Sequence, residues 1–374
     1  MAGHDPPAGP PRPKLARLGI LQTEVVQTSI RLAEVGLAWD ALWQRAGQNV
    51  FQSHGWVSAW WTTRQAEDQS RLCVGLCWAG GDLVAVMPFT TRRHRGVRVL
   101  EWAAKDCSDY CDALVEPDLA EGWRALAQVW AAVAAIGGFD LVYLSHVRPD
   151  AALHGLLDRQ PQALPLRRGR RSAISRQVHR HGPGGQAWFQ GLDEEVRNSH
   201  ARGMHALGET APVRSELSRP GDAADDMIDR MIGLKRQWLA STGQSYMILD
   251  NDALTFRALV NELARQHALQ IFSLRCGDHL VAALLNIATG MGMQVFLAAH
   301  DPRFEPASPE RLVVVELLIK AFDMGITEVD LLCVEADGKF DFANAQVDLA
   351  SYVGAQTLIG KLALTVGERL ERRA

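Results

Sequence analysis

The pattern of hydrophobic and polar positions in the first 150 residues alternates between the period of strands and the period of helices. In chain order, the pattern predicts a strand at 19–29, helices at 32–45 and 54–64, strands at 71–78, 82–90 and 97–103, a helix at 121–136 and a strand at 139–145. Gly80 and Gly81 stand between the second and third strands, as in a hairpin turn. The predicted order of this half is β-α-α-β-β-β-α-β.

The second half repeats that order with negligible sequence identity to the first. Its expected elements are a strand at 212–218, helices at 222–241 and 251–267, strands at 269–275, 279–288 and 292–299, a helix at 312–324 and a strand at 328–333. Two more helices are predicted, at 193–208 before this set and at 356–373 after it. The repeat is therefore one of architecture and not of residues.

The spacing of these elements predicts two α/β domains. We expect a disordered, proline-rich tail at 1–15, an N-terminal domain at 16–150, a basic linker at 151–191 and a C-terminal domain at 192–374. The arginine run at 167–171 in the linker fits a solvated connection. Its functional alternative is a contact with an acidic glycan or with tRNA phosphates.

Composition narrows the class of protein. The net charge of -4 argues against a nucleic-acid or anionic-membrane partner, and no stretch of about 18 apolar residues predicts a membrane span. Six cysteines without a secretory signal indicate a reducing compartment, so we expect a cytoplasmic protein. The C-x3-C pairs lack the ligand set of a zinc site, and we expect structural thiols and no metal.

Short stretches of both halves resemble one family. They lie at 234–243, 280–284, 296–302, 308–312 and 328–332, with 50–56 and 107–112 in the first half. Their order resembles the GNAT superfamily of acetyltransferases, and most of all its CelD-like subgroup of the cellulose-biosynthesis type, which is related to the FemABX transferases. The resemblance implies tandem GNAT-like domains, each a mixed, largely antiparallel sheet flanked by helices.

By this resemblance, the chain is an acyltransferase. It would move an acetyl or longer acyl group from acetyl-CoA or another acyl-CoA to an amine or hydroxyl of a small-molecule or glycan acceptor, such as a sugar or polysaccharide precursor. The family holds the donor between a late strand and the start of the following helix. The corresponding positions here are Leu297, Ala298, Ala299, Arg303, Ser308 and Arg311.

Three residues are candidates for the chemistry. Asp330 interrupts an apolar strand, where it could orient the acceptor, act as general base or serve a structural hydrogen bond. His300 ends the strand that would face the thioester, and it is either a base or a turn histidine. Lys339 follows the last strand as a possible contact to an anionic acceptor or donor phosphate, or as a solvated loop lysine.

The stretch 301–310 departs from the family pattern. It contains no glycine, three prolines remove N–H donors, and Glu305 and Glu310 would repel a pyrophosphate. This favours an alternative in which the fold persists as a non-catalytic binding or scaffold protein. A third reading, an aminoacyl-tRNA-dependent transferase, lacks the larger acceptor insertion or coiled-coil arm usual in such enzymes.

Overall fold

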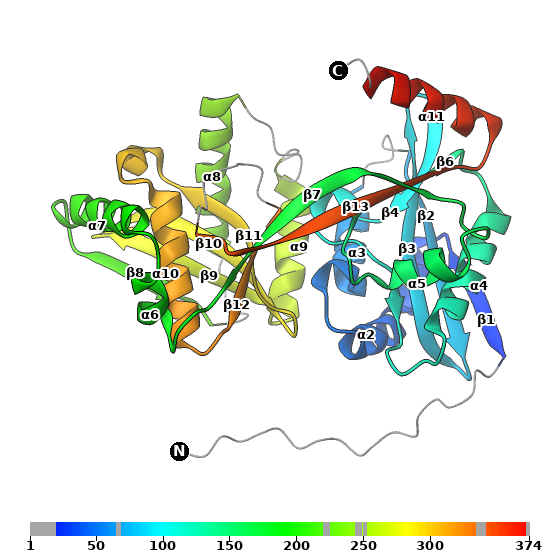
Figure 1. Cartoon of the computed structure of the whole chain (residues 1–374), viewed down its shortest axis with the longest axis horizontal. Coiled ribbons are helices and arrows are strands. Elements are labelled where there is room, and N and C mark those ends of the chain that lie inside the picture. Colours follow the sequence, from blue (N-terminus) through cyan, green and yellow to red (C-terminus); the bar gives the residue numbers. More distant parts are fainter. Residues whose placement is uncertain are drawn as a thin grey trace.

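The computed structural model describes residues 20–64, 69–219, 225–243, 249, 253–333 and 342–371. Its strands form one 13-stranded sheet with helices packed on its faces (Figure 1). The fold is therefore α/β with a mixed, largely antiparallel sheet, as predicted. The tail expected at 1–15 lies outside the described residues. Within the described chain, no helix combines the length and the apolar character needed to cross a membrane.

The first half contains the predicted elements in the predicted order. They are β1 (Leu21–Val26), α1 (Ser29–Glu34), α2 (Gly36–Arg45), α3 (His54–Thr62), β2 (Arg71–Ala79), β3 (Asp82–His94), β4 (Val97–Trp102), β5 (Leu114–Val115), α4 (Gly122–Ile136) and β6 (Leu141–Val147). The helix expected at 32–45 is divided into α1 and α2, and the two-residue β5 was not foreseen. Gly80 and Gly81 form the turn between β2 and β3, both with positive φ.

The second half follows the same sequence of elements. They are α7 (Glu194–Gly208), β8 (Val213–Leu217), α8 (Asp225–Thr242), α9 (Leu254–Arg265), β9 (Leu269–Cys276), β10 (His279–Thr289), β11 (Gly292–His300), the short helix η6 (Pro302–Ala307), α10 (Pro309–Asp323) and β12 (Glu328–Cys333). The strand order β8-β9-β10-β11-β12 mirrors β1-β2-β3-β4-β6 of the first half. The repeated element order is thus confirmed.

The segment 151–191, expected as a linker, is instead built of regular elements. It forms α5 (Ala152–Arg159), β7 (Arg167–His179) and α6 (Gly185–Gln190). The chain after β12 adds an unforeseen strand, β13 (Ala345–Ala355), before the predicted last helix, α11 (Leu358–Glu371). The arginine run therefore lies on a strand.

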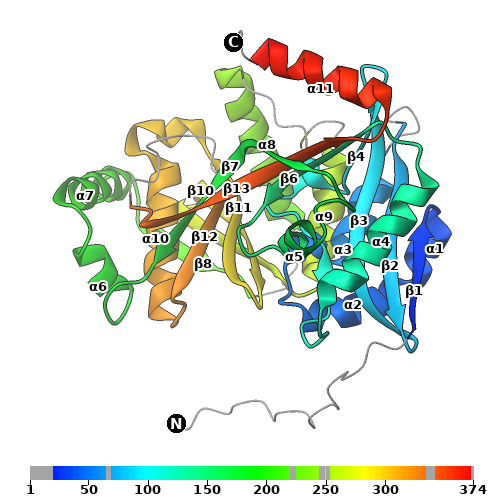
Figure 2. The same ribbon diagram turned by 45° about the vertical axis from the view of Figure 1, so that its right-hand side comes forward.

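β7 and β13 connect the halves by an exchange of strands. The sheet order is β6-β13-β7-β12, so β13 pairs with β6 of the first half and β7 pairs with β12 of the second. The two strands form the long diagonal ribbon in the middle of Figures 1 and 2. The halves are consequently joined through backbone hydrogen bonds.

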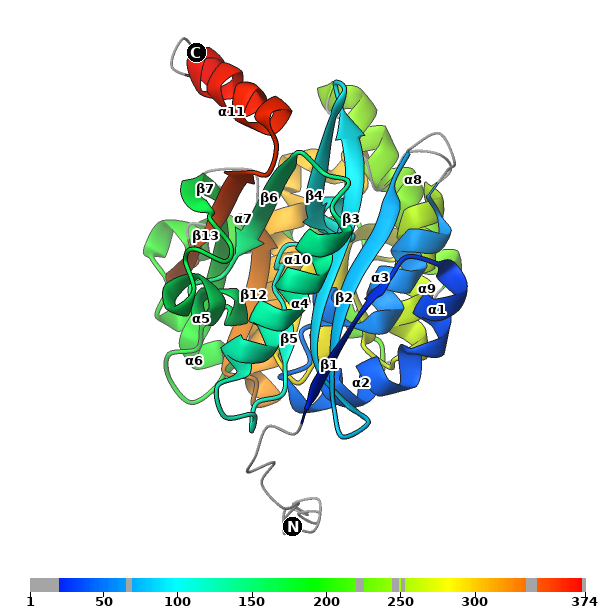
Figure 3. The same cartoon turned by 90° about the vertical axis from the view of Figure 1, so that its right-hand side faces the viewer.

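One hydrophobic core runs through both halves. It includes Trp56 and Trp60 of α3 together with Phe256 of α9 and Phe296 of β11. Both tryptophans are buried. A second core lies under α4 and a third under α10. Figure 3 shows α4 across β2 and β3, with α11 projecting from the body.

Candidate functional site

The two parallel strands β11 and β12 separate after a short paired stretch. In the described chain they pair only at Met293↔Val329 and Gln294↔Asp330. Just beyond, β11 has one extra residue, since β10 pairs with Val295 and then with Leu297. A bulge of this kind bends the strand away from its neighbour. The strands therefore diverge from Asp330 onward.

Asp330 lies at this point of divergence with its carboxylate buried and fully engaged. Its side chain accepts hydrogen bonds from the Tyr110 hydroxyl at 2.6 Å, from the Ser175 hydroxyl at 3.0 Å and from the Leu332 backbone N–H at 2.8 Å. Only 6% of the residue is exposed. Three hydrogen-bond donors thus satisfy the oxygens of a side chain that is buried in an apolar strand.

The partners of Asp330 come from distant parts of the chain. Tyr110 lies in the loop after β4, Ser175 lies on β7, and the Tyr110 and Ser175 hydroxyl oxygens are 2.5 Å apart. Burial and the neighbouring Asp330 carboxylate raise the pKa of Tyr110, so its hydroxyl stays a donor. The Arg148 guanidinium stacks 4.8 Å from the centre of the Tyr110 ring. The carboxylate predicted from the second half is thus held in part by Tyr110 of the first half and by Ser175 of β7.

A second carboxyl lies next to this network. Asp109 precedes Tyr110, and its backbone carbonyl is 3.9 Å from the Cys333 thiol at the end of β12. Burial raises the pKa of Asp109 to about 7, and the charge of Asp330 adds to the rise. Burial and the like charge of Asp330 therefore both favour a neutral Asp109.

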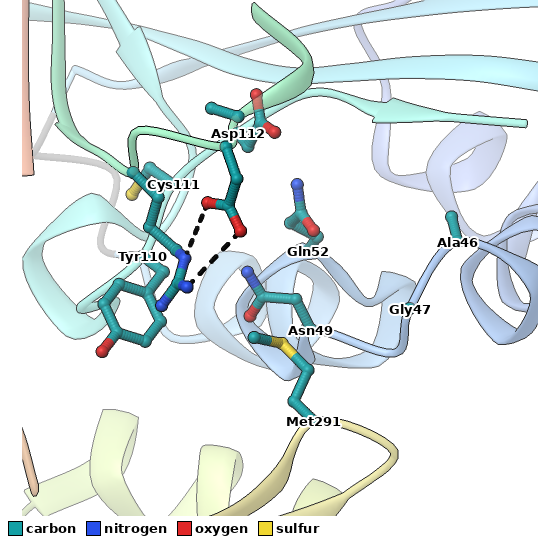
Figure 4. A pocket seen from close by; sticks show the side chains of 11 residues that line it. Ala46, Gly47, Asn49, Gln52, Tyr110, Cys111, Asp112 and Met291 are labelled. Atoms are coloured by element: carbon teal, nitrogen blue, oxygen red, sulfur yellow. Dashed lines mark hydrogen bonds and ion pairs between the residues drawn. The ribbon is translucent and has the colours of Figure 1, made fainter. Parts of the chain in front are cut away.

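A cavity of about 230 Å³ opens beside Tyr110 between the halves. In Figure 4 the side chains of Asn49 and Gln52 face it from the first half, and Met291 of the β10–β11 turn stands at its edge. Arg148 and Asp150, which also line it, form an ion pair at 3.0 Å. A volume of about 230 Å³ is on the scale of a small molecule.

His300 ends β11 away from Asp330's partners. Its Nε2 lies 2.7 Å from Glu305 Oε2 of η6, and its Nδ1 lies 3.9 Å from Glu310 Oε2 of α10. The residue is buried. Two acidic side chains therefore bracket the imidazole at the start of the late helix.

The six positions expected to hold the donor surround the same strand end. Leu297 and Ala299 are buried in the shared core, and Ala298 packs on the α10 side. Ser308 is the N-cap residue of α10, but its backbone is left-handed, with φ 54°, and its hydroxyl makes no capping hydrogen bond. The Ser308 side chain therefore does not cap the helix.

The two arginines of this group already interact with neighbouring side chains. Arg303 forms an ion pair with Asp301 at 2.6 Å, and the Arg311 guanidinium lies 5.6 Å from the Phe342 ring centre. Lys339, the remaining candidate, lies outside the described residues. Its role stays a prediction.

The corresponding strands of the first half separate in the same way. β4 and β6 pair only at Val99↔Leu141 and Leu100↔Val142 in the described chain. There, however, the buried Glu101 and three half-buried side chains, Arg92, Asp106 and Lys105, form a network of ion pairs, and Lys105 lies over the Tyr143 ring of β6. The space between these first-half strands is thus occupied by the chain's own charged side chains. This leaves the second half as the better candidate site.

Sequence reasoning missed Tyr110, Ser175, Arg148 and Asp109. The stretch 107–112 carries part of the family resemblance, and this was the available signal for Asp109 and Tyr110. Ser175 had none, because it lies in the segment taken for a linker.

Comparison with known proteins identifies the fold of this site. Residues 194–342 match the family model described as an acetyltransferase (GNAT) domain. These residues have a GNAT acetyltransferase fold. No curated protein is similar enough in sequence to count as a match. The match includes β11, β12 and α10, so the diverging strands belong to the GNAT domain.

Solved structures share this fold over most of the chain. FemX is 9% identical, with a TM-score of 0.57 over 90% of this chain and 97% of its own. A conserved protein of unknown function from Bacteroides thetaiotaomicron is 11% identical, with a TM-score of 0.51 over 89% and 100%. The C-terminal domain of a protein described as a lysylphosphatidylglycerol synthetase, from Agrobacterium fabrum, is 10% identical, with a TM-score of 0.51 over 89% and 95%. At these identities the likeness is one of fold.

Proposed function

We propose that this chain is an acyltransferase that moves an acetyl or longer acyl group from an acyl-CoA to an amine or hydroxyl. The observation that carries the proposal is the divergence of β11 and β12 at Gln294↔Asp330 within the GNAT domain, with a buried carboxylate at its apex. A thioester placed between diverging strands meets backbone groups that the sheet no longer pairs. The reacting carbonyl would then lie near Asp330.

The transfer is a direct displacement. The acceptor nitrogen or oxygen attacks the thioester carbonyl, the new bond to carbon forms, and the C–S bond breaks to release the thiol. The acceptor's proton passes to the Tyr110 oxygen while the Tyr110 proton moves along its 2.6 Å hydrogen bond to Asp330, and the carboxyl then protonates the leaving sulfur by the same path. Asp330 is the base in this scheme, and His300 remains a second candidate.

The acceptor site in this proposal is the cavity beside Tyr110. Asn49 and Gln52 supply amide groups, and Arg148 and Asp150 supply charges. Such a lining fits a small molecule rich in hydroxyl and amine groups, or one unit of a glycan. We extend the proposal to a sugar or polysaccharide precursor in the cytoplasm, in line with the CelD-like resemblance, and to Lys339 as a contact for an anionic group.

A non-catalytic binding protein is the competing function. The start of α10 supports it, because the preceding residues contain no glycine and Glu305 and Glu310 stand next to His300. The shared fold with FemX keeps an aminoacyl-tRNA-dependent transferase as a third candidate.

Thermal unfolding with acetyl-CoA, longer acyl-CoAs and free CoA tests the proposal. A thioester at about 100 times its Kd stabilises the fold by about 2.7 kcal/mol. With an amine acceptor and acetyl-CoA, Asp330→Asn and Tyr110→Phe should each release CoA at least about a hundredfold more slowly than wild type. Tyr143→Phe, an exposed tyrosine of β6, is the matched control. If no thioester up to millimolar concentration stabilised the fold, the proposed acyltransferase function would be contradicted.

A further inference from the structure

Gln294 has a buried side-chain amide whose polar atoms make no hydrogen bond within the described part of the chain. Only 1% of the residue is exposed, and among the described residues neither its Oε1 nor its Nε2 has a partner. A buried polar group left unpaired costs roughly 1–3 kcal/mol, so such a group is seldom kept without a use. The fold therefore holds one donor and one acceptor ready at this position.

The position of Gln294 places that amide at the apex of the diverging strands. Gln294 is the last residue of β11 that pairs with β12, and its partner in register is Asp330. On the far side of β12, Asp330 is in register with Gln177 of β7, which is also buried. Residues in register share one face of a sheet, so a row of polar side chains crosses an otherwise apolar face here.

The start of α10, in contrast, offers little to a pyrophosphate. Pro309 has no N–H, the Ser308 N–H bonds the Glu305 carbonyl, and the Leu312 N–H bonds the Ser308 carbonyl. The first turn of α10 also carries the acidic side chain of Glu310. A negative charge beside a helix start opposes the binding of an anion.

We propose that the thioester donor is recognised through its amide-bearing arm at Gln294, and that its nucleotide part adds little to binding. The Gln294 Oε1 accepts from an amide N–H of the arm, and the Nε2 donates to an amide carbonyl. This rests on the proposed acyl-transfer function and specifies how the same site selects its donor. The arm occurs in coenzyme A and on acyl-carrier proteins, and both present the same amides.

The affinities of two donors for the full-length chain test this inference. Acetyl-CoA carries the nucleotide and S-acetyl-pantetheine lacks it, and calorimetry measures the Kd of each. We expect S-acetyl-pantetheine to bind within about fivefold of acetyl-CoA. Gln294→Leu should weaken both donors by about fivefold to tenfold, the usual effect of losing a buried neutral hydrogen bond or two. An acetylated acyl-carrier protein as a third donor separates the two sources of the arm.

Gln270→Leu is the matched control. Gln270 is buried on β9, two strands from β11, and its neighbours Leu269 and Ile271 belong to the shared core, so its own side chain lies on the opposite face. This variant should bind both donors as wild type does. Gln294→Glu, which keeps the shape and replaces the donor Nε2 by an oxygen, is the second variant at the site.

The outcomes are distinct. If acetyl-CoA binds at least a hundredfold more tightly than S-acetyl-pantetheine, or if both Gln294 variants bind the donors as wild type does, the inference is wrong while the acyltransferase stands. If wild type binds none of the three donors, the proposed function is wrong, and the inference that rests on it is wrong as well.

Discussion

Asp109 and Asp330 bring two carboxyl groups to the contact between the halves, and they are held in opposite ways. Asp330 accepts three hydrogen bonds. Asp109 is partly buried beside it, and desolvation raises its pKa from 3.8 to about 7. The folded chain therefore keeps the Asp109 proton up to about pH 7, whereas the unfolded chain releases it near pH 4. The contribution of this bound proton to the free energy of unfolding is fully present below about pH 4. It is lost as the pH rises from about 4 to about 7.

Asp109→Asn keeps the shape of this side chain and removes its titration. Relative to wild type, the variant should gain free energy of unfolding as the pH rises from 4 to 8, by up to about 4 kcal/mol for a shift of three pKa units. Urea unfolding across this range measures the difference. Asp118→Asn, at an exposed aspartate, is the control. An Asp109→Asn curve parallel to that of wild type would contradict the burial of the proton.

Prediction from sequence reached Asp330 but not its partners. A carboxylate within an apolar strand is visible in the sequence, because it breaks the strand's pattern. Tyr110 is 220 positions away, and nothing local to Tyr110 indicates a hydrogen bond across that distance. Residue chemistry was predictable, whereas the pairing depends on the tertiary fold.

At the scale of elements, the strands that follow a local apolar pattern were predicted and the exchanged strands were not. β7 carries Arg167, Arg168, Arg170, Arg171 and Arg176, so it lacks the alternation of a half-buried strand. It is a strand because β12 and β13 pair with its two edges, and both follow it by more than 140 residues. Pairing over such a distance overrides local preference.

α7 positions η6 and the start of α10 through the close approach of one glycine. A Cβ at Gly203 would lie 2.7 Å from the Ala307 carbonyl oxygen and 3.1 Å from the Leu312 methyl groups. Backbone cannot move aside cheaply, so Gly203→Ala should destabilise the chain by about 1–3 kcal/mol. Gly208→Ala is the control in the same helix, because no atom lies within 4 Å of its Cβ position. Thermal unfolding measures the stability of both variants. Equal destabilisation by Gly203→Ala and Gly208→Ala would contradict this close packing.

At the scale of the whole molecule, the exchange of β7 and β13 and the shared core make the two halves interdependent. Each half completes the other's sheet, and Phe256 of the second half belongs to the same core as Trp56 of the first. The two-domain division at 16–150 and 192–374 stays a prediction about the chain's ancestry and function. For folding, the structure favours one cooperative unit, since each half's sheet is extended by a strand from the other side of the chain and the two share a core.

Phe256→Ala tests whether the two halves unfold as one cooperative unit. The ring is fully buried, so its removal should lower the free energy of unfolding by about 3–5 kcal/mol. Nine of the eleven tryptophans precede residue 150, so tryptophan fluorescence reports mainly on the first half, whereas far-UV circular dichroism reports on the whole chain. In a single cooperative unit, a substitution in α9 shifts both signals to the same lower urea midpoint. Leu254→Ala, an exposed position on the same helix, should leave both unchanged. If the fluorescence midpoint stayed at the wild-type value while the dichroism split into two transitions, the halves would be separate domains, and the exchanged strands would not couple their stability.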